Sequence, residues 1–122
     1  METKPKILIV DDDQEIRRLL QEFLEENGFL VVTAADGQQA LKLAAEQLPD
    51  LVVTDLLLPK EHGIEVMQAI KDEFFLPIIA MSGIYGKDEI KDKLQDVYIE
   101  DFFEKPLDLK EILASIRSIL NE

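Results

Sequence analysis

Short apolar runs alternate along the chain with longer segments in which apolar residues recur every three or four positions. An unbroken apolar run rich in valine, isoleucine and leucine is typical of a strand buried on both faces of a parallel sheet. A spacing of three or four is typical of an amphipathic helix. Strand and helix signals alternate five times, which predicts an α/β fold with a doubly wound parallel sheet. The predicted strands are 6–10, 30–34, 51–54, 77–81 and 101–104.

The predicted helices follow from capping residues, helix breakers and apolar stripes. Asp13 is suited to cap the first helix, and Gly28 is suited to end it. The fourth helix is the weakest, because Ile90 and Leu94 are nearly its only apolar anchors. The predicted helices are 14–27, 37–48, a third that begins near residue 63, 87–96 and 109–120. The first carries the stripe Ile16, Leu19, Leu20, Phe23 and Leu24, and the last carries Leu109, Ile112, Leu113, Ile116 and Leu120.

Acidic residues stand where two of the apolar runs end. Asp11, Asp12 and Asp13 follow the first run, and Asp55 follows the third. The carboxyl ends of parallel strands meet at one edge of the sheet, where α/β folds bind ligands. Crowded carboxylates repel one another, and Mg²⁺ is a suitable partner because it takes oxygen ligands and needs only one or two protein carboxylates. The pattern predicts a Mg²⁺ site, although capping of the following helix explains Asp13 by itself.

Composition limits the classes of function. The net charge of −13, from 26 acidic and 13 basic residues, argues against direct binding of nucleic acid or of an anionic membrane. The absence of cysteine excludes disulfides, thiolate zinc sites and a cysteine nucleophile. No segment has the apolar core of a signal peptide or the length of a membrane span. We expect one soluble, cytoplasmic domain over residues 1–122, with no output domain in the chain.

Two further polar residues stand at the ends of the fourth and fifth predicted strands. Ser82 and Lys105 are placed to converge with Asp55 at the same edge of the sheet. Aspartate is a competent nucleophile that forms an aspartyl-phosphate. Phosphoryl transfer needs little beyond positioning and charge stabilisation, which a metal ion and a lysine supply. The arrangement therefore favours phosphoryl transfer to a carboxylate.

The ordered set of motifs strongly resembles the receiver domain of two-component response regulators, over essentially the whole chain. The resemblance implies a flavodoxin-like fold with five helices and the strand order 2-1-3-4-5. It also implies a phosphoacceptor signalling domain that supports its own slow dephosphorylation and turns over no separate substrate. The matching pieces are Ile7-Leu8-Ile9-Val10-Asp11-Asp12, Val53-Thr54-Asp55 with Pro59 four residues on, Gly63, Met81-Ser82-Gly83 and Lys105-Pro106.

The resemblance assigns roles to the residues of the acidic site. Asp55 corresponds to the phosphoacceptor. Asp11 and Asp12 correspond to the acidic pair that holds Mg²⁺, together with Asp55 and the backbone carbonyl of Leu57. Lys105 corresponds to the lysine that pairs first with Asp55 and then with the phosphoryl oxygens.

The resemblance also implies a switch and its partners. Ser82 corresponds to the hydroxyl that turns toward the phosphoryl group, and Phe102 to the aromatic switch residue. Pro106 is expected to follow a cis peptide bond. The implied partners are a sensor histidine kinase or phosphotransfer protein, a downstream effector or output domain, and a second copy in a phosphorylation-dependent dimer. The implied contact surface is formed by the fourth helix, the fifth strand and the fifth helix.

Simpler interpretations stand beside these roles. Ser82 is also suited to satisfy a local turn, Phe102 is also suited to an ordinary core position, and His62 is expected to be solvated rather than a ligand or phosphodonor.

The chain departs from the family pattern at Tyr98, where many receivers have a small turn, and the apolar Leu57 is placed to hinder a hydrolytic water. Two rival functions are an interaction module without phosphorylation and a Mg²⁺-dependent phosphohydrolase.

Overall fold

The computed structural model describes residues 3–56, 63–94 and 97–121. Strands and helices alternate through these residues, as the apolar pattern predicts. The strands are β1 (Lys6–Val10), β2 (Leu30–Ala34), β3 (Leu51–Asp55), β4 (Ile78–Ser82) and β5 (Asp101–Glu104). The helices are α1 (Gln14–Glu26), α2 (Gly37–Gln47), α3 (Gly63–Phe74), α4 (Lys87–Lys93) and α5 (Leu109–Ile119).

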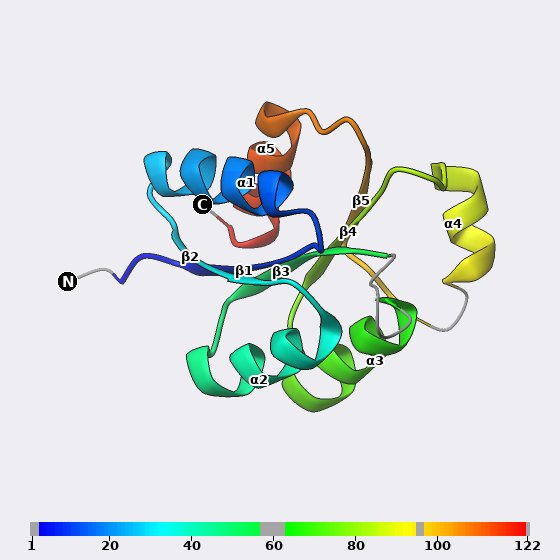
Figure 1. The fold of residues 1–122 in the computed structure, drawn as a ribbon, viewed down its shortest axis with the longest axis horizontal. Helices are drawn as coiled ribbons and strands as arrows, with labels where there is room; N and C mark the ends of the chain where they lie inside the picture. The colour runs from blue at the N-terminus through cyan, green and yellow to red at the C-terminus, as the bar shows by residue number, and fades with distance from the viewer. Residues whose placement is uncertain (1–2, 57–62, 95–96, 122) are drawn as a thin grey trace.

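All five strands form one parallel sheet in the order β2-β1-β3-β4-β5 (Figure 1). β1 lies between β2 and β3, so that Ile9 pairs with Thr33 on one side and with Val53 on the other. The later strands then add outward, β4 next to β3 and β5 next to β4. The predicted flavodoxin-like class and strand order are confirmed.

Helices cover both faces of the sheet, with α1 and α5 on one face and α2 and α3 on the other (Figure 1). Side chains alternate along each strand, so Ile7 and Ile9 belong to one core cluster and Leu8 and Val10 to the other. The unbroken apolar runs thus arise because both faces of the strands are buried. Helix residues buried against the sheet include Leu20, Leu24, Ile112 and Ile116 on the first face, and Ala40, Ala44, Val66, Met67 and Ile70 on the second.

Aspartates cap α1, α2 and α5, at Asp13, Asp36 and Asp108. The carboxylate of Asp13 accepts a hydrogen bond of 2.9 Å from the backbone N–H of Glu15, which confirms the predicted cap of α1. Asp108 accepts from the N–H groups of Lys110 and Glu111 at the start of α5. In contrast, α4 follows Gly86, which has no side chain to form a cap.

Two strands differ in their bounds from the prediction. β4 begins at Ile78 rather than Pro77, because proline has no N–H to donate to a neighbouring strand, although the Pro77 carbonyl still accepts from Val52. β4 extends to Ser82, whose carbonyl accepts a 2.8 Å bond from the N–H of Lys105. β3 extends to Asp55, which pairs with Met81. The ladder therefore carries these site residues on regular strand backbone.

Two helix predictions also need correction. Leu19, placed in the apolar stripe of the first helix, is 45% exposed, because the buried line of α1 runs through Leu20 and Leu24. The fourth helix ends at Lys93, and its predicted end at Asp96 lies outside the described residues. Among the residues described, no helix is long and apolar enough to cross a membrane.

The segment before β5, where the sequence departs from the receiver pattern, is attached to α3. Tyr98 is exposed, and the ammonium of Lys71 on α3 lies 5.5 Å from the centre of its ring. Lys71 also donates to both carboxylate oxygens of Glu100, at 2.6 and 2.9 Å. The same carboxylate accepts a 2.8 Å bond from the backbone N–H of Ile78. Glu100 thus joins α3 to the entry of both β4 and β5.

Candidate functional site

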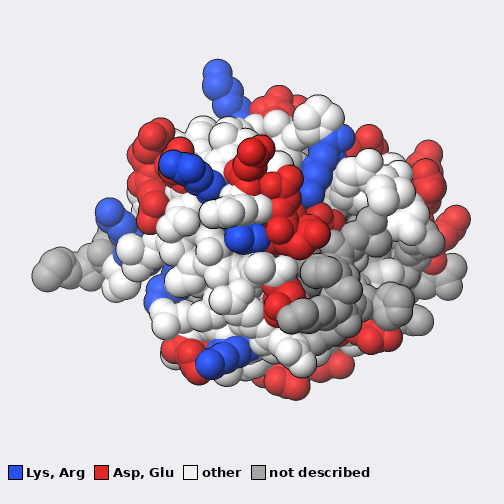
Figure 2. All heavy atoms as spheres, viewed as in Figure 1, with Lys and Arg blue, Asp and Glu red and all other residues white. Residues whose placement is uncertain are grey.

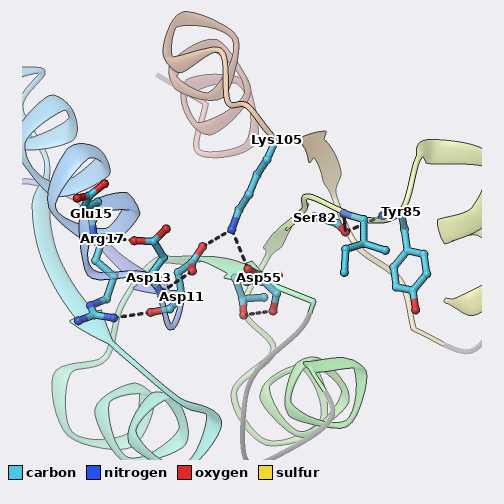
Figure 3. Close-up of polar contacts among 10 residues, drawn as sticks. Asp11, Asp13, Glu15, Arg17, Asp55, Ser82, Tyr85 and Lys105 are labelled. Atoms are coloured by element: carbon cyan, nitrogen blue, oxygen red, sulfur yellow. Dashed lines mark hydrogen bonds and ion pairs between the residues drawn. The ribbon is translucent and has the colours of Figure 1, made fainter.

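The candidate site lies at the carboxyl edge of the sheet, where the chain leaves four of its strands. Asp11 follows β1, Asp55 ends β3, Ser82 ends β4 and Lys105 follows β5. Figure 3 shows Asp11, Asp55 and Lys105 pointing toward one another from these separate elements. Figure 2 shows acidic side chains gathered on this face over the end of β1 and the start of α1.

Lys105 joins the two buried carboxylates of the site. Its ammonium donates a hydrogen bond of 2.8 Å to Asp11 Oδ2 and another of 2.8 Å to Asp55 Oδ2. Asp11 is fully buried and Asp55 is 6% exposed. Buried carboxylates need such partners, because an unpaired charge away from water is costly. The side chain reaches them from a cis Lys105–Pro106 peptide, as expected.

The loop between β1 and α1 is held by contacts to its backbone and to the Asp11 side chain. The N–H of Asp11 donates to the carbonyl of Ala34 at 3.1 Å, which continues the β1–β2 ladder by one residue. Asp11 Oδ1 accepts from the N–H of Asp13 at 2.9 Å. The Asp11 carbonyl accepts a 2.7 Å bond from Nη1 of Arg17 (Figure 3). Sequence reasoning missed Arg17, whose only signal is its place one turn after the acidic cluster.

Burial and ion pairing oppose each other at Asp11. Burial raises the pKa of the Asp11 carboxyl, the hydrogen bonds from Lys105 and Asp13 lower it, and the charge of Asp55 raises it further. Because burial is the largest effect, the pKa lies above its ordinary value. The proximity of two carboxylates is therefore unfavourable in itself, even with a lysine between them.

The balance at Lys105 has the opposite outcome. Burial lowers the pKa of the Lys105 ammonium, but the hydrogen bonds to Asp11 and Asp55 and the negative charges of these carboxylates together raise it by more. The pKa lies above its ordinary value, so the side chain remains charged at neutral pH. Lys105 thus contributes one permanent positive charge to the acidic site.

Asp11, Asp12 and Asp55 could together hold a metal ion. Each offers one carboxylate oxygen, and these three oxygens lie within 4.8 Å of one another. Asp12 is exposed while the other two are buried, so the group opens toward solvent on one side. An all-oxygen donor set suits Mg²⁺, which commonly keeps several water ligands. The residues present fit that ion; Leu57, whose carbonyl was the fourth predicted ligand, lies outside the described residues.

Ser82 and Phe102 are placed differently from the charged residues. The Ser82 hydroxyl oxygen accepts bonds from the N–H groups of Ile84 and Tyr85, at 3.1 and 2.9 Å. In Figure 3 it is accordingly turned toward the loop after β4, which is the local-turn interpretation of this residue. Phe102 is 6% exposed and belongs to the core cluster that contains Ile90 of α4. His62 lies outside the described residues.

Gly63 permits a close approach behind the site. A Cβ atom at this position would overlap the carbonyl oxygen of Leu56, the residue after Asp55. Only glycine therefore allows α3 to begin directly against the end of β3. This explains physically why a glycine follows the Asp55 motif at this spacing.

Comparison with known proteins agrees with this geometry. The model of the family described as response regulator receiver domain matches residues 7–117. The chain belongs to this family. Receiver domains are signalling domains of two-component systems rather than enzymes that turn over a separate substrate, and they typically bind Mg²⁺.

Individual relatives extend the comparison. The receiver domain is 41% identical over 118 residues to the alkaline phosphatase synthesis transcriptional regulatory protein PhoP of Bacillus subtilis, covering 94% of this chain and 48% of PhoP. It is 37% identical over 115 residues to the transcriptional regulatory protein CpxR of Escherichia coli, covering 94% and 49%. The chain thus spans about half the length of these curated relatives. The solved structure of the chemotaxis response regulator CheY4 of Vibrio cholerae is similar with a TM-score of 0.87 and 28% identity, covering 96% of this chain and 99% of CheY4.

Proposed function

We propose that this receiver domain accepts a phosphoryl group on Asp55 from the phosphohistidine of a sensor kinase or phosphotransfer protein. The observation that carries the proposal is the pairing of Asp55 and Asp11 with a single lysine at 2.8 Å. The Asp55 carboxylate stands at a strand end, next to the acidic pair Asp11 and Asp12 and in contact with the positive charge of Lys105. The cytoplasm is the proposed setting, with residues 1–122 acting as one receiver unit.

The chemistry assigned to these side chains is a displacement at phosphorus. One carboxylate oxygen of Asp55 forms a bond to phosphorus while the phosphorus–nitrogen bond of the donor imidazole breaks. The imidazole keeps the electron pair and takes up a proton. The Lys105 ammonium faces the phosphoryl oxygens and stabilises their negative charge. A Mg²⁺ ion held by Asp11, Asp12, Asp55 and the Leu57 carbonyl would supply further charge neutralisation.

The proposed consequence is a switch in the second half of the chain. A phosphoryl group carries about two negative charges and strong acceptor oxygens, so converting the Asp55 carboxylate to an aspartyl-phosphate adds about one net negative charge. In the proposed switch, the Ser82 hydroxyl leaves its contacts with Ile84 and Tyr85 and turns to donate to a phosphoryl oxygen, and Phe102 follows it. The altered surface comprises α4, β5 and α5. PhoP and CpxR are transcriptional regulators by name, so the proposed partner is a transcriptional output domain or effector, with dimerisation as one response.

The experiment is phosphorylation by acetyl phosphate with Mg²⁺, followed by mass spectrometry of the intact chain and its peptides. We expect one phosphoryl group on Asp55 and none in Asp55→Asn. Asp13→Asn is the matched control, because it removes a neighbouring charge yet preserves the capping ability of the side chain, and it should be labelled normally. Label that persists in Asp55→Asn would refute the assignment. A wild-type chain that takes no label would indicate the interaction module without phosphorylation.

A further inference from the structure

Within the described ranges, Arg17 is the α1 side chain that donates a hydrogen bond to a carbonyl of the acidic loop. Its Nη1 donates a 2.7 Å bond to the Asp11 carbonyl, six residues earlier in the chain. Arg18, the next residue on the helix, instead pairs with Glu22 in solvent at 3.3 Å, with both side chains more than half exposed. The two arginines thus carry the same charge on one helix, but only Arg17 is directed to the site.

The bond from Arg17 fixes the peptide group from which Asp12 begins. A peptide unit is planar, so holding the Asp11 carbonyl also fixes the direction of the Asp12 N–H and Cα. Asp12 is exposed, and within the described part of the chain its carboxylate makes no hydrogen bond or ion pair. Its position near Asp11 and Asp55 therefore depends on the backbone alone.

We infer that Arg17 is a positioning residue for Mg²⁺ binding, which acts by holding the Asp11–Asp12 peptide so that the Asp12 carboxylate faces the other two. This inference rests on the proposed function through its metal site. Removing a partner that orients a metal ligand typically weakens metal affinity by about 10- to 100-fold. The planar guanidinium holds its N–H groups in fixed directions, which a lysine ammonium does not, so arginine is better suited to orient the Asp11 carbonyl.

The sign of the effect separates positioning from simple electrostatics. A positive charge near a cation site repels the cation, so loss of charge alone would make Mg²⁺ bind more tightly. Loss of the hydrogen bond to the Asp11 carbonyl would make it bind more weakly. Arg18→Gln is the matched control, because it removes the same charge one residue away without touching the loop.

The experiment is a Mg²⁺ titration of the full chain, followed by amide chemical shifts of residues 11–13 and 105, together with the metal-free melting temperature. We expect Arg17→Gln to raise the Mg²⁺ Kd by about 10-fold, Arg17→Lys to raise it less, and Arg18→Gln to leave it unchanged or lower it. An equal or lower Kd in Arg17→Gln would overturn the inference, even if the melting temperature fell. Should Arg17→Gln not fold, a Kd of Arg17→Lys equal to wild type would overturn it. A wild-type chain that binds no Mg²⁺ would overturn the proposed metal site and this role together.

Discussion

Lys105 carries less positive charge than the carboxylates around it require. One ammonium lies between Asp11 and Asp55, and Asp12 offers a third carboxylate within 4.8 Å of the other two. Two unit charges at that separation interact by about 3 kcal/mol at an effective dielectric constant of about 20, before further screening by solvent. The residues that suit the site to a cation therefore oppose the folded state when no cation is bound.

Asp12→Ala should stabilise the metal-free protein. The substitution removes one of three crowded charges, and Asp12 has no hydrogen bond to lose within the described residues. Because solvent screens an exposed carboxylate, we expect a rise in melting temperature of about 2–4 °C. Added Mg²⁺ should then raise the melting temperature of the variant much less than that of wild type. Thermal unfolding followed by circular dichroism, with and without Mg²⁺, measures both changes.

Asp13→Ala is the control for that prediction. It removes the same charge from the adjacent residue but also removes the cap on the Glu15 N–H. Loss of such a cap costs about 1 kcal/mol, so this variant should melt at a lower temperature than wild type. A fall in the melting temperature of metal-free Asp12→Ala would show that Asp12 is structural and that the crowding argument is wrong.

The contribution of Lys105 to stability should disappear at high pH. Its folded-state pKa lies above the ordinary value of 10.5, so the folded state binds the proton more tightly than the unfolded state. The stabilisation is therefore complete below pH 10.5 and is lost as the pH rises through the raised pKa. We expect Lys105→Met to be less stable than wild type by about 2 kcal/mol at neutral pH.

Urea unfolding of wild type and Lys105→Met at neutral pH and near pH 11 measures this contribution. The difference between the two free energies of unfolding should shrink at the higher pH, because the unfolded wild-type chain then releases the Lys105 proton that the folded state still binds. Other lysines and the tyrosines titrate in both proteins and cancel in the comparison. A difference that stays constant across this range would mean that the ammonium is not the source of the stabilisation.

The charged residues of the site were predictable because they stand at strand ends. The contacts of Ser82 and Arg17 were not predictable, because they depend on how the side chains are oriented. Asp11, Asp55 and Lys105 each stand at the end of a predicted strand or directly after it, so the topology alone brings them to one edge. The direction of the Ser82 hydroxyl depends on nearby N–H groups whose positions are set by the loop after β4. The bond from Arg17 depends on the angle at which α1 leaves the loop, which no spacing rule encodes.

Among the elements, α4 is the one least fixed to the rest of the molecule. It has seven residues, no side-chain cap at Gly86, and Ile90 as its only buried residue between Lys87 and Lys93 among the side chains described there. Few buried apolar contacts and an uncapped end give low local stability. The structure confirms the shortage of apolar anchors that the sequence pattern showed, and the low local stability stays a prediction. The exact end of the helix was not predictable, because no strong stop signal follows it.

Beryllofluoride, a tetrahedral mimic of a phosphoryl group, should perturb this region more than α1. Amide signals between Ser82 and Lys105 should shift on its addition with Mg²⁺, because the loop after β4 and α4 are the least constrained neighbours of the site. Signals from Gln21 to Glu26 on α1 serve as the internal control and should change little. A uniform response over both segments, or none between Ser82 and Lys105, would refute the proposed switch.

Glu100 should stabilise the starts of β4 and β5, at the opposite end of these strands from Ser82 and Lys105. Its carboxylate holds Lys71 of α3 and the N–H of Ile78 at the start of β4. Glu100→Ala removes both contacts and leaves the N–H of Ile78 without this partner, which should lower the free energy of unfolding by about 2 kcal/mol. Glu100→Gln keeps an acceptor oxygen and should lose less. Urea unfolding measures the order, and equal losses in the two variants would show that the bond to Ile78 contributes nothing.

At the scale of the whole molecule, the strand order divides the site between two parts of the chain. The first three strands in sequence, β2, β1 and β3, are also neighbours in the sheet, and together they carry Asp11 and Asp55. β4 and β5 then extend the sheet on one side only, and Lys105 follows β5. The ion pairs of Lys105 therefore join the last strand added to the part of the sheet that precedes it.

This division has a consequence for folding cooperativity. A partial opening that released β5 would separate Lys105 from Asp11 and Asp55 and would leave two close carboxylates without their common partner. Repulsion between these carboxylates raises the free energy of the open form. The ion pairs of Lys105 therefore disfavour detachment of β5, the strand that Lys105 follows. In native-state hydrogen exchange, Lys105→Met should speed the exchange of β5 and α5 amides more than that of β1 amides. Equal acceleration throughout the sheet would instead show that the lysine stabilises only the fully folded molecule, and that the two parts of the sheet open together.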